Sequence, residues 1–430
     1  MLAADYPVRI TYFADIRFPL ERANGIQTME TCHALAVRGH HVTLAVRPDT
    51  RKPARDPYAF YGLPRHERLR IEVAPVSGPA MARRLGYLAF AAGRGMGRGR
   101  ADVLFTRDLG VASMMLGFPR ALRPPVVYES HGYAPDVASA LPDLVATATR
   151  PSRSKLRRLT SREARVWRDA EGYVTITRGL ADELARRHGP RDRIAVVPDG
   201  ARIRPPGGSS TPDGRATPDR SVKPAPAHDE GGQTSNFAKN GDLTPPPGVV
   251  GYAGHLYAWK GVDVLLRALA RVPAARGLIV GGHGVEPDLG RLKAQAEELG
   301  IAERVTFTGL VEPEQVPAYL ERSDVLALPN PESAISTHFT SPLKLFEYMA
   351  AGRAIIASDL PAIREVLRHE VHALLVPPGD AEALGAAIER LLGDRVLAGR
   401  LAAAAQQTVV DYGWDRRAER LEALFTQVVE

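Results

Sequence analysis

Short apolar runs separated by stretches of helical periodicity recur along both halves of the chain. The runs of the first half are Val8–Phe13, His41–Val46, Val103–Phe105, Val126–Tyr128, Tyr173–Ile176 and Ile194–Val197. Those of the second half are Val249–Tyr252, Gly277–Val280, Val305–Thr308, Val325–Leu328, Ala354–Ala357 and Ala373–Val376. Near-continuous apolar runs that alternate with helices are typical of parallel strands covered on both faces. The pattern predicts an α/β protein with two doubly wound parallel-sheet domains that face each other across a cleft.

Segment 204–248 interrupts this rhythm. It holds nine prolines and seven glycines in 45 residues, with only three large apolar side chains. Such a composition cannot build a packed core, so we expect a disordered linker. The predicted organisation is therefore an N-terminal domain of residues 1–203, the linker 204–248, a second domain of residues 249–414 and a final segment 415–430.

Composition places the chain among ordinary globular proteins. Of its 430 residues, 44% are hydrophobic and 24% charged, which excludes fibrous and wholly disordered classes. No apolar run approaches the roughly 18 residues that a membrane span needs. The single cysteine, Cys32, has no internal disulfide partner, and Asp5 and Arg9 interrupt the apolar stretch of a secretory signal. These features predict a cytoplasmic setting.

The net charge of +7 is unevenly divided. Residues 1–203 hold 33 Lys and Arg against 20 Asp and Glu, whereas residues 204–430 hold 23 against 29. A basic half favours phosphates, acidic glycans or an anionic membrane surface. Nucleic acid is not expected as a partner, because neither an aromatic stacking platform nor a helix-turn-helix pattern accompanies the charge.

Segment 150–168 concentrates this positive charge. It holds eight basic residues and one acidic residue, Glu163, with apolar residues interleaved, and residues 81–100 add a second cationic stretch. The pattern predicts a basic amphipathic helix. That helix either rests on anionic lipid at the inner face of the membrane or packs its apolar face into the core and leaves its charges in solvent.

Two loops have the residues that hold phosphate groups. Gly254 and Lys260 follow the run Val249–Tyr252 and precede a periodic helix beginning at Val262. Glycine lets the backbone approach a ligand closely, and a lysine in the same turn neutralises an anion. The alternative is a tight connection with a solvated lysine.

The second loop opens a short predicted helix. Thr340 and Ser341 offer a hydroxyl N-cap, Pro342 suits the first helical position, and Gly352 suits the end. The free N–H groups at such a helix start form a ready site for an anion. Glu347, about one and a half turns in, either accepts hydrogen bonds from a pair of sugar hydroxyls or lies exposed on an amphipathic helix.

Several segments together resemble the family-four glycosyltransferases, retaining enzymes of the GT-B fold with two Rossmann-like domains. Those similar to its nucleotide-binding domain are GYAGHLYAWKGVDVLLRAL, LIVGGHGVEPDL, RVTFTGLVEPEQVPAYL, SPLKLFEYMAAGRAIIASDLPAIREVL and HALLVPPGD. In the first half, its glycine loop, histidine strand and closing strand are matched by NGIQTMETCHALAVRGHHVTLAVR, VVYESHG and IAVVPDGARI. The C-terminal stretch Asp411–Val429 is similar to the helix that in this fold crosses back to the first domain.

The resemblance implies a set of donor-binding residues. The residues implied to contact the diphosphate are Gly25, Gly254, His255, Lys260, Ser341, Pro342, Leu343 and Lys344. The family has an Arg five positions before its Lys, and here His255 stands in that place before Lys260. The second of two family glutamates matches Glu347, which is implied to contact the ribose. Backbone groups around Gly309 and Leu310 are implied to meet the base.

The residues facing the donor sugar depart from the family. Phe339 stands eight positions before Glu347, where the family has its first glutamate. Glu332 and the polar run Ser336–Ser341 are the alternatives, and the donor-sugar candidates are Glu332, His338, Phe339 and Thr340. His131 matches a family histidine that faces the sugar from the first domain. The residues implied to be catalytic are His131, Lys260 and Glu347.

The resemblance implies a retaining transfer of a sugar from a UDP- or GDP-linked donor to a hydroxyl of a glycan, lipid-linked or small-molecule acceptor, as in polysaccharide biosynthesis. In the family's usual account the departing diphosphate assists the incoming hydroxyl on the same face, so stabilising the leaving group is most of the catalysis. Neither a DxD pair nor a ligand-spaced His, Cys and Asp cluster is present, so no metal and no cofactor are expected. A nucleotide-sugar epimerase of the same fold and a non-catalytic nucleotide-sugar binding protein are the alternatives.

Overall fold

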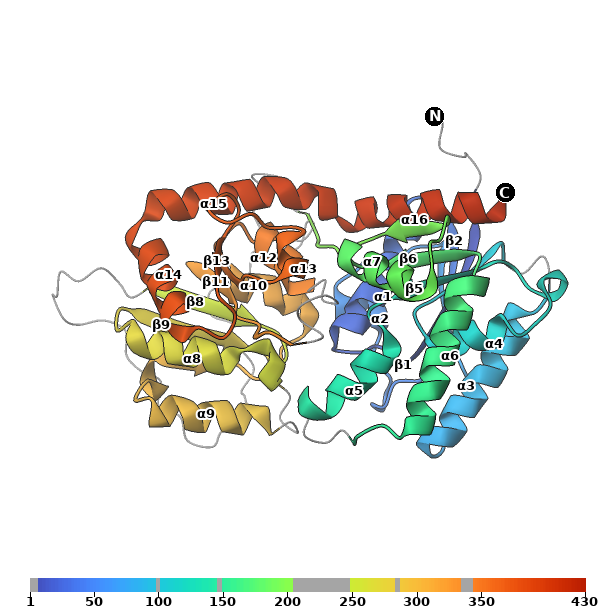
Figure 1. Ribbon diagram of the computed structural model, residues 1–430, viewed down its shortest axis with the longest axis horizontal. Helices are drawn as coiled ribbons and strands as arrows, with labels where there is room; N and C mark the ends of the chain where they lie inside the picture. The colour runs from blue at the N-terminus through green and yellow to red at the C-terminus, as the bar shows by residue number, and fades with distance from the viewer. Residues whose placement is uncertain (1–6, 98–100, 145–148, 204–247, 283–286, 334–342) are drawn as a thin grey trace.

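The computed structural model describes residues 7–97, 101–144, 149–203, 248–282, 287–333 and 343–430 (Figure 1). The predicted linker lies outside the described residues apart from its last member. Gly248, assigned to the linker from the sequence, is the first residue of a strand. The candidates His338, Phe339, Thr340, Ser341 and Pro342 also lie outside the described residues.

Two parallel sheets organise the described chain. The first has the order β3-β2-β1-β4-β5-β6-β7, with β1 Arg9–Arg17, β2 His41–Arg47, β3 Leu69–Val73, β4 Val103–Thr106, β5 Val126–Ser130, β6 Gly172–Thr175 and β7 Ile194–Val196. The second has the order β10-β9-β8-β11-β12-β13, with β8 Gly248–Ala253, β9 Ala275–Val280, β10 Val305–Phe307, β11 Val325–Leu328, β12 Ala354–Ser358 and β13 Leu374–Val376. Each predicted run overlaps one of these strands, and the prediction of two parallel α/β domains is confirmed.

The apolar pattern missed one strand, β3. It lies at the edge of the first sheet and pairs only with β2 among the described strands. Its sequence, LRIEV, places the charged residues Arg70 and Glu72 between apolar ones. Edge strands commonly carry such charges because one side faces solvent, so no continuous apolar run marks them.

Helices cover both faces of each sheet. Those of the first domain are α1 Ala23–Val37, α2 Pro57–Tyr61, α3 Ala80–Gly95, α4 Leu109–Met115, α5 Ala134–Leu144, α6 Arg153–Asp169 and α7 Arg178–His188. Those that follow β8 are α8 Val262–Arg271, α9 Asp288–Glu298, α10 Val316–Leu320, α12 Leu343–Ala350, α13 Pro361–Arg364, α14 Ala381–Gly393, α15 Arg395–Thr408 and α16 Trp414–Val429. Short 3₁₀ turns lie at Arg120–Leu122, Ala258–Lys260, Ala302–Arg304, Pro313–Gln315 and Val409–Tyr412.

The last helix, α16, belongs to the core of the first domain. Figure 1 shows α15 beside the second sheet and α16 continuing along the first. Leu421, Phe425 and Val428 are buried among the side chains of that sheet and of α1. The Phe425 ring lies 5.3 Å from the ring of Phe105 in β4. The chain therefore crosses between the domains twice, once before β8 and once after α15.

The basic segment folds as the helix α6. Ser152 caps it by accepting a hydrogen bond from the Lys155 amide, and Val166 and Trp167 are buried against the first domain. Arg153, Lys155, Arg157 and Arg158 are exposed. Among the described helices, none combines the length and apolar character required to cross a bilayer.

Candidate active site

The strand order places the crevices of the two sheets. It reverses between β1 and β4 in the first sheet and between β8 and β11 in the second. Ligands of doubly wound proteins bind beyond the carboxyl ends of strands at such reversals. The loops after β1, β4, β5 and β8 are therefore where functional side chains are expected.

The loop after β8 is shaped by two glycines. Gly254 has φ +141°, and a Cβ there would lie 2.2 Å from the Lys344 ammonium nitrogen. Gly261 has φ +76°, and a Cβ there would lie 1.8 Å from the carbonyl oxygen of Pro329. Any other residue is strained by the backbone conformation at either position. At Gly261 it would also clash with the Pro329 backbone, and at Gly254 the Lys344 side chain would have to move away. The glycine turn thus lets α12 bring a lysine against the backbone of the loop.

Three aromatic rings stack along the same loop. The His255 and Tyr257 rings lie 5.2 Å apart at 10°, and the Tyr257 and Trp259 rings lie 6.2 Å apart at 9°. The Lys260 Nζ sits 3.6 Å above the centre of the Trp259 ring. A cation over an indole face is attracted by the ring's quadrupole, so the stack fixes where Lys260 carries its charge.

Helix α12 brings a second lysine to this turn. The Lys344 Nζ donates a hydrogen bond of 2.8 Å to the Tyr252 hydroxyl, which in turn donates to the His255 carbonyl oxygen at 2.6 Å. Burial lowers the pKa of Lys344 to about 7. Burial, and then the charge of Lys344, lower the pKa of Lys260 well below its usual value. The two lysines are therefore close enough for the charge of Lys344 to act on Lys260, and burial favours loss of a proton from both.

Glu347 lies one turn further along α12. Burial raises its pKa to about 7, and the Lys344 charge opposes that shift. Glu30, Arg202 and Asp199 of the first domain are close enough to act on its charge. Glu347 therefore lies near charged groups of the first domain, and its ribose contact stays a prediction.

The first domain contributes a buried polar cluster after β5. Glu129, in β5, bonds to the His131 Nε2 at 2.5 Å and accepts from the Gln27 amide nitrogen at 2.5 Å. Its other oxygen accepts from Arg417 of α16 at 2.7 Å. Burial, and then the Arg107 charge, lower the pKa of His131 to about 4, so its ring is neutral near pH 7.

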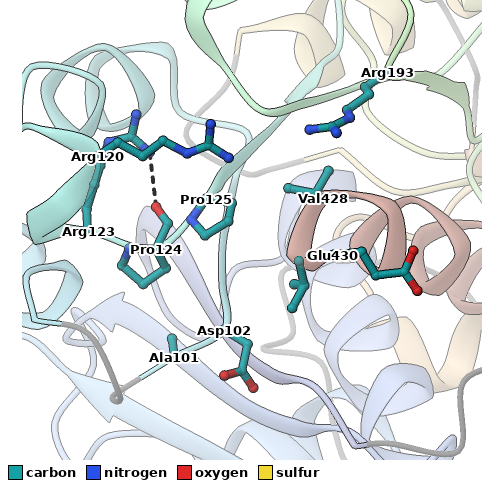
Figure 2. A pocket seen from close by; sticks show the side chains of 10 residues that line it. Ala101, Asp102, Arg120, Arg123, Pro124, Pro125, Arg193, Val428 and Glu430 are labelled. Carbon is teal, nitrogen blue, oxygen red and sulfur yellow. Dashed lines mark hydrogen bonds between the residues drawn. The ribbon is translucent and has the colours of Figure 1, made fainter.

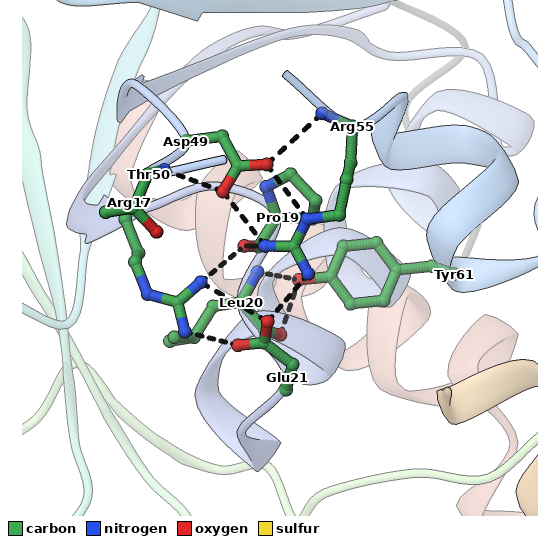
Figure 3. A network of polar contacts seen from close by, with 8 residues as sticks. All are labelled: Arg17, Pro19, Leu20, Glu21, Asp49, Thr50, Arg55 and Tyr61. Carbon is green, nitrogen blue, oxygen red and sulfur yellow. Dashed lines mark hydrogen bonds and ion pairs between the residues drawn. The ribbon is translucent and has the colours of Figure 1, made fainter. Parts of the chain in front are cut away.

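The loop between β1 and α1 is held by a polar network (Figure 3). Arg55 donates to Glu21 at 2.6 Å, to Asp49 at 2.8 Å and to the carbonyl oxygen of Pro19 at 2.9 Å. Burial alone would raise the pKa of Glu21, but hydrogen bonds from Arg17 and Arg55 lower it to about 2. The network stiffens the segment immediately before Gly25.

Gly25 lies at the first turn of α1. A Cβ there would lie 2.3 Å from the Leu20 carbonyl oxygen and 2.5 Å from the Tyr61 hydroxyl oxygen. The Tyr61 hydroxyl is fixed in turn, since it donates to the Leu20 carbonyl at 2.8 Å. Glycine is therefore required at this position by the packing of the β1–α1 loop itself.

The two domains meet at the start of α12 and at α13. The Leu343 side chain is buried in the hydrophobic cluster of the first domain, so only its backbone is available to a ligand. The Glu365 carboxylate accepts hydrogen bonds of 2.8 Å from the backbone amides of Arg178 and Gly179, at the start of α7. A pocket of about 280 Å³ lies between these elements, lined by Thr177, Phe346, Glu365 and others.

A further cavity of about 310 Å³ lies at the other end of the first sheet (Figure 2). It is lined by Asp102 and Pro125, which precede β4 and β5, by Arg120 and Arg193, and by Glu430 after α16. Because ligands of parallel sheets bind at the carboxyl ends of strands, this cavity does not belong to the candidate site.

The structure brings some candidates together and separates others. Gly254, Lys260, Lys344 and Glu347 share one face of the second domain, whereas His131 and Gly25 come from the first. Within the described residues, no hydrogen bond joins His131 to Lys260 or Glu347. Gly309 has φ +69° and its carbonyl accepts from Gly281 at 3.0 Å, whereas Leu310 and Glu332 are exposed. The assigned roles of these residues stay predictions.

Sequence reasoning missed the partners of His131. Glu129 has a usable sequence signal, because it is a charged residue within an apolar strand, only two positions before His131. Gln27 lies in the glycine-loop segment but has no charge to draw notice. Arg107 follows β4 and donates to the Gln27 amide oxygen at 2.5 Å. Arg417 has no sequence signal, since only the return of α16 brings it near.

Two family models match the chain. The model described as "Glycosyl transferase 4-like domain" matches residues 25–200, and the one described as "Glycosyl transferases group 1" matches residues 247–394. A curated relative, D-inositol 3-phosphate glycosyltransferase of Xylanimonas cellulosilytica, is 28% identical over 271 residues. That match covers 62% of this chain and only 60% of the relative's length.

Solved structures are similar over nearly the whole chain. Sucrose-phosphate synthase of Thermosynechococcus elongatus superposes with a TM-score of 0.72 at 19% identity, covering 97% of this chain and 98% of that one. Anabaena HepE in complex with UDP-glucose superposes with a TM-score of 0.66 at 16% identity, covering 98% of this chain and 100% of that one. These likenesses support the GT-B fold predicted from the sequence. The two family models, which together match most of the chain, show that the chain belongs to the family-four glycosyltransferases.

Proposed function

We propose that the protein transfers a sugar from a nucleotide diphosphate donor to a hydroxyl acceptor, with retention of anomeric configuration and without a metal. The observation that carries this proposal is the pair Lys260 and Lys344 beside the glycine turn at Gly254. Within the described residues neither lysine forms an ion pair, and burial lowers the pKa of both. Both properties suit a site that receives a polyanion.

Burial of the two lysines has a cost in free energy. An ammonium group removed from water without a counter-ion loses several kcal/mol of solvation, or gives up its proton. A diphosphate between Lys260 and Lys344 offsets this cost and restores both charges. The complex of the structurally similar HepE with UDP-glucose is in keeping with a nucleotide-sugar donor.

In the proposed mechanism, negative charge develops on the leaving diphosphate as its bond to the sugar breaks. Lys260 and Lys344 stabilise that charge, and the acceptor hydroxyl attacks on the same face and passes its proton to a phosphate oxygen. His131 approaches the sugar from the first domain, and Glu347 holds the ribose hydroxyls. The loss of one such charge-stabilising donor typically lowers the rate by about 10²–10³.

The acceptor is proposed to meet the first domain, which carries the excess of positive charge. The Xylanimonas relative is named for inositol 3-phosphate, an anionic polyol. An acceptor with a phosphate or another acidic group, either free or linked to a lipid, fits the same charge.

For a lipid-linked acceptor, we propose that the exposed Arg153, Lys155, Arg157 and Arg158 of α6 attach the protein to the inner face of the membrane. Each basic residue contributes on the order of 1 kcal/mol at an anionic surface. Co-sedimentation is expected with vesicles of anionic lipid, to fall as salt rises, and to be absent with zwitterionic vesicles. Equal binding to anionic and zwitterionic vesicles would refute attachment through the basic residues of α6.

The experiment for the catalytic proposal has two stages. UDP- and GDP-sugars are first screened for stabilisation, where a donor at 100 times its Kd adds about 2.7 kcal/mol to the free energy of unfolding. The stabilising donor is then incubated alone and with phosphorylated polyol or glycan acceptors, and the products are examined by NMR. A new glycoside with the donor's anomeric configuration supports the proposal.

Other products would contradict it. An altered sugar from the donor alone identifies an epimerase. Stabilisation with neither product across the acceptor panel identifies a binding protein. Glu347→Ala is expected to lower turnover strongly, and unchanged turnover would remove Glu347 from the site.

A further inference from the structure

Glu129 is the hub of the polar cluster in the first domain. Its side chain is 0% exposed, whereas that of its neighbour His131 is 21% exposed. One carboxylate oxygen bonds to His131 and to Gln27, and the other accepts from Arg417. A ligand in the crevice can therefore reach His131 but not Glu129, which acts only through the groups it holds.

Arg417 reaches this carboxylate from the far end of the sequence. Its side chain is 1% exposed, and besides Glu129 it donates to the Thr31 hydroxyl at 3.0 Å and to the carbonyl oxygens of Val197 and Pro198, both at 2.8 Å. These partners come from α1 and from the end of β7. A single guanidinium from α16 thus ties together three segments beside the candidate site.

A buried ion pair of this kind is a poor device for stability alone. The cost of dehydrating two charges commonly equals or exceeds their attraction, and apolar replacements of similar volume are often as stable. The pair instead orients the groups around it, because a carboxylate bonds only to donors and a guanidinium only to acceptors, each in a limited range of directions. The geometry of the groups around Glu129 is the part of the cluster that an apolar core could not reproduce.

The carboxylate also selects the form of the imidazole. Glu129 can only accept hydrogen bonds when it is ionised, and the Arg417 guanidinium keeps its pKa well below the usual range despite burial. The Nε2 of His131, 2.5 Å from this oxygen, must therefore carry the hydrogen. In the neutral ring this leaves Nδ1 as a lone-pair acceptor.

We propose that Glu129 and Arg417 are positioning residues for the transfer reaction, which fix the ring orientation and the Nε2–H tautomer of His131. This inference rests on the proposed function, since it assigns His131 to the donor-sugar side of the reaction. Through the same oxygen Glu129 holds the Gln27 amide, whose own oxygen accepts from Arg107. The C-terminal helix α16 thereby contributes to the geometry of the site as well as linking the two domains.

The first experiment is Glu129→Gln. Glutamine keeps the shape, but Arg417 can only donate, so the amide oxygen is expected to face Arg417 and the N–H₂ group to face His131 Nε2, which forces the other tautomer. We expect kcat to fall by roughly 100-fold or more, with the donor KM changed less than twofold, because the lysines and Glu347 proposed to hold the diphosphate and ribose lie on the second domain, away from Glu129. The matched control is Glu163→Gln, a buried glutamate of the same domain whose carboxylate accepts from the Ala134 amide.

The second experiment reads the tautomer without turnover. Histidine ring ¹⁵N spectra, assigned by comparison with His131→Gln, are expected to show the Nε2–H form in the wild type and a changed form in Glu129→Gln. Should the protein transfer no sugar, this measurement still tests the positioning, so the two proposals fail separately. An unchanged tautomer, or a kcat no lower than that of Glu163→Gln, would overturn the inference.

Arg417 is tested by a graded pair of variants. Arg417→Met leaves Glu129 buried without its counter-ion and is expected to unfold more easily, so Arg417→Lys, which keeps the charge, is measured beside it. We expect Arg417→Lys to fold with a lowered kcat, while Arg416→Met, an exposed change one position earlier on α16, leaves kcat unchanged. If Arg417→Lys is fully active with a wild-type His131 spectrum, only the positive charge at position 417 is needed. If Arg417→Met folds and is fully active, Arg417 has no positioning role.

Discussion

The two faces of the candidate site handle charge in opposite ways. On the first domain, Glu129 and Arg417 are fully buried and paired with each other, and their remaining polar groups bond to backbone and side chains. On the second domain, Lys260 and Lys344 contact aromatic rings and a hydroxyl, and within the described residues neither meets a carboxylate at ion-pair distance. The charges of the first-domain face are paired within the protein, whereas those of the second-domain face are suited to a charged ligand.

The difference separates positioning from binding. A paired cluster has a fixed geometry before any ligand arrives, which suits a group that must meet a sugar in one orientation. Unpaired, dehydrated cations gain most when an anion reaches them, because the cost of their burial has already been met in folding. The comparison predicts that substitutions of Lys260 and Lys344, on the second domain, alter donor affinity and turnover with little loss of folding stability.

The largest effect is expected from Lys260→Met. Turnover should fall about 100- to 1,000-fold, since one cation on the leaving group is lost. The melting temperature should stay the same or rise, because a buried ammonium is replaced by an apolar side chain. Steady-state kinetics and thermal unfolding check both parts, with the exposed Lys293→Met of α9 as the control. A strong loss of stability would contradict the comparison.

A smaller effect concerns pH. The pKa of Lys344 is lowered to about 7 and that of Glu347 is raised to about 7, so a rise in pH removes a positive charge and adds a negative one. Loss of the Lys344 charge disfavours a diphosphate, whereas an ionised Glu347 accepts hydrogen bonds from ribose hydroxyls. Affinity for a UDP-sugar should therefore fall between pH 7 and 9 by up to about tenfold per unit, through Lys344.

Calorimetric titration with a UDP-sugar measures this dependence, since its diphosphate diester does not titrate in the range. Lys344→Met should bind more weakly at pH 7 and show a flatter pH dependence. Equal affinity at pH 7 and pH 9 for the wild type would show that Lys344 does not face the donor.

The smallest effect concerns Glu163, a buried acid of the first domain for which the described part of the chain provides no ion-pair partner. Burial raises its pKa from 4.5 to about 7, although the Ala134 amide donates to it at 3.0 Å. The folded protein therefore binds the proton more tightly than the unfolded chain. Its contribution to stability is present below about pH 4.5 and is lost as pH rises through 7, by at most roughly 1.4 kcal/mol per unit.

Denaturant unfolding at pH 5 and pH 8 checks this expectation. Glu163→Gln should gain stability relative to the wild type at pH 8 and change little at pH 5. A difference between the two proteins that is independent of pH would mean that Glu163 keeps the same charge in both states.

Much of the fold was predictable because parallel strands are buried on both faces. The runs around Val103, Val126 and Ala354 are apolar regardless of their neighbours, and they located the strands. The edge strand β3 escaped because Arg70 and Glu72 stand between its apolar residues, so that no continuous apolar run marks it. In the candidate site, Gly254, Lys260 and Glu347 stand in local motifs, so the sequence could point to them.

By itself, the sequence determined the two α/β domains, the family and the residues of the glycine turn. These depend on local periodicity and on spacing within a few turns of chain. Only the tertiary structure decided that Lys344 comes against Gly254 and that Arg417 meets Glu129, 288 residues away along the chain. Contacts of that range depend on how whole domains pack, and neither composition nor periodicity records which distant charges are buried together.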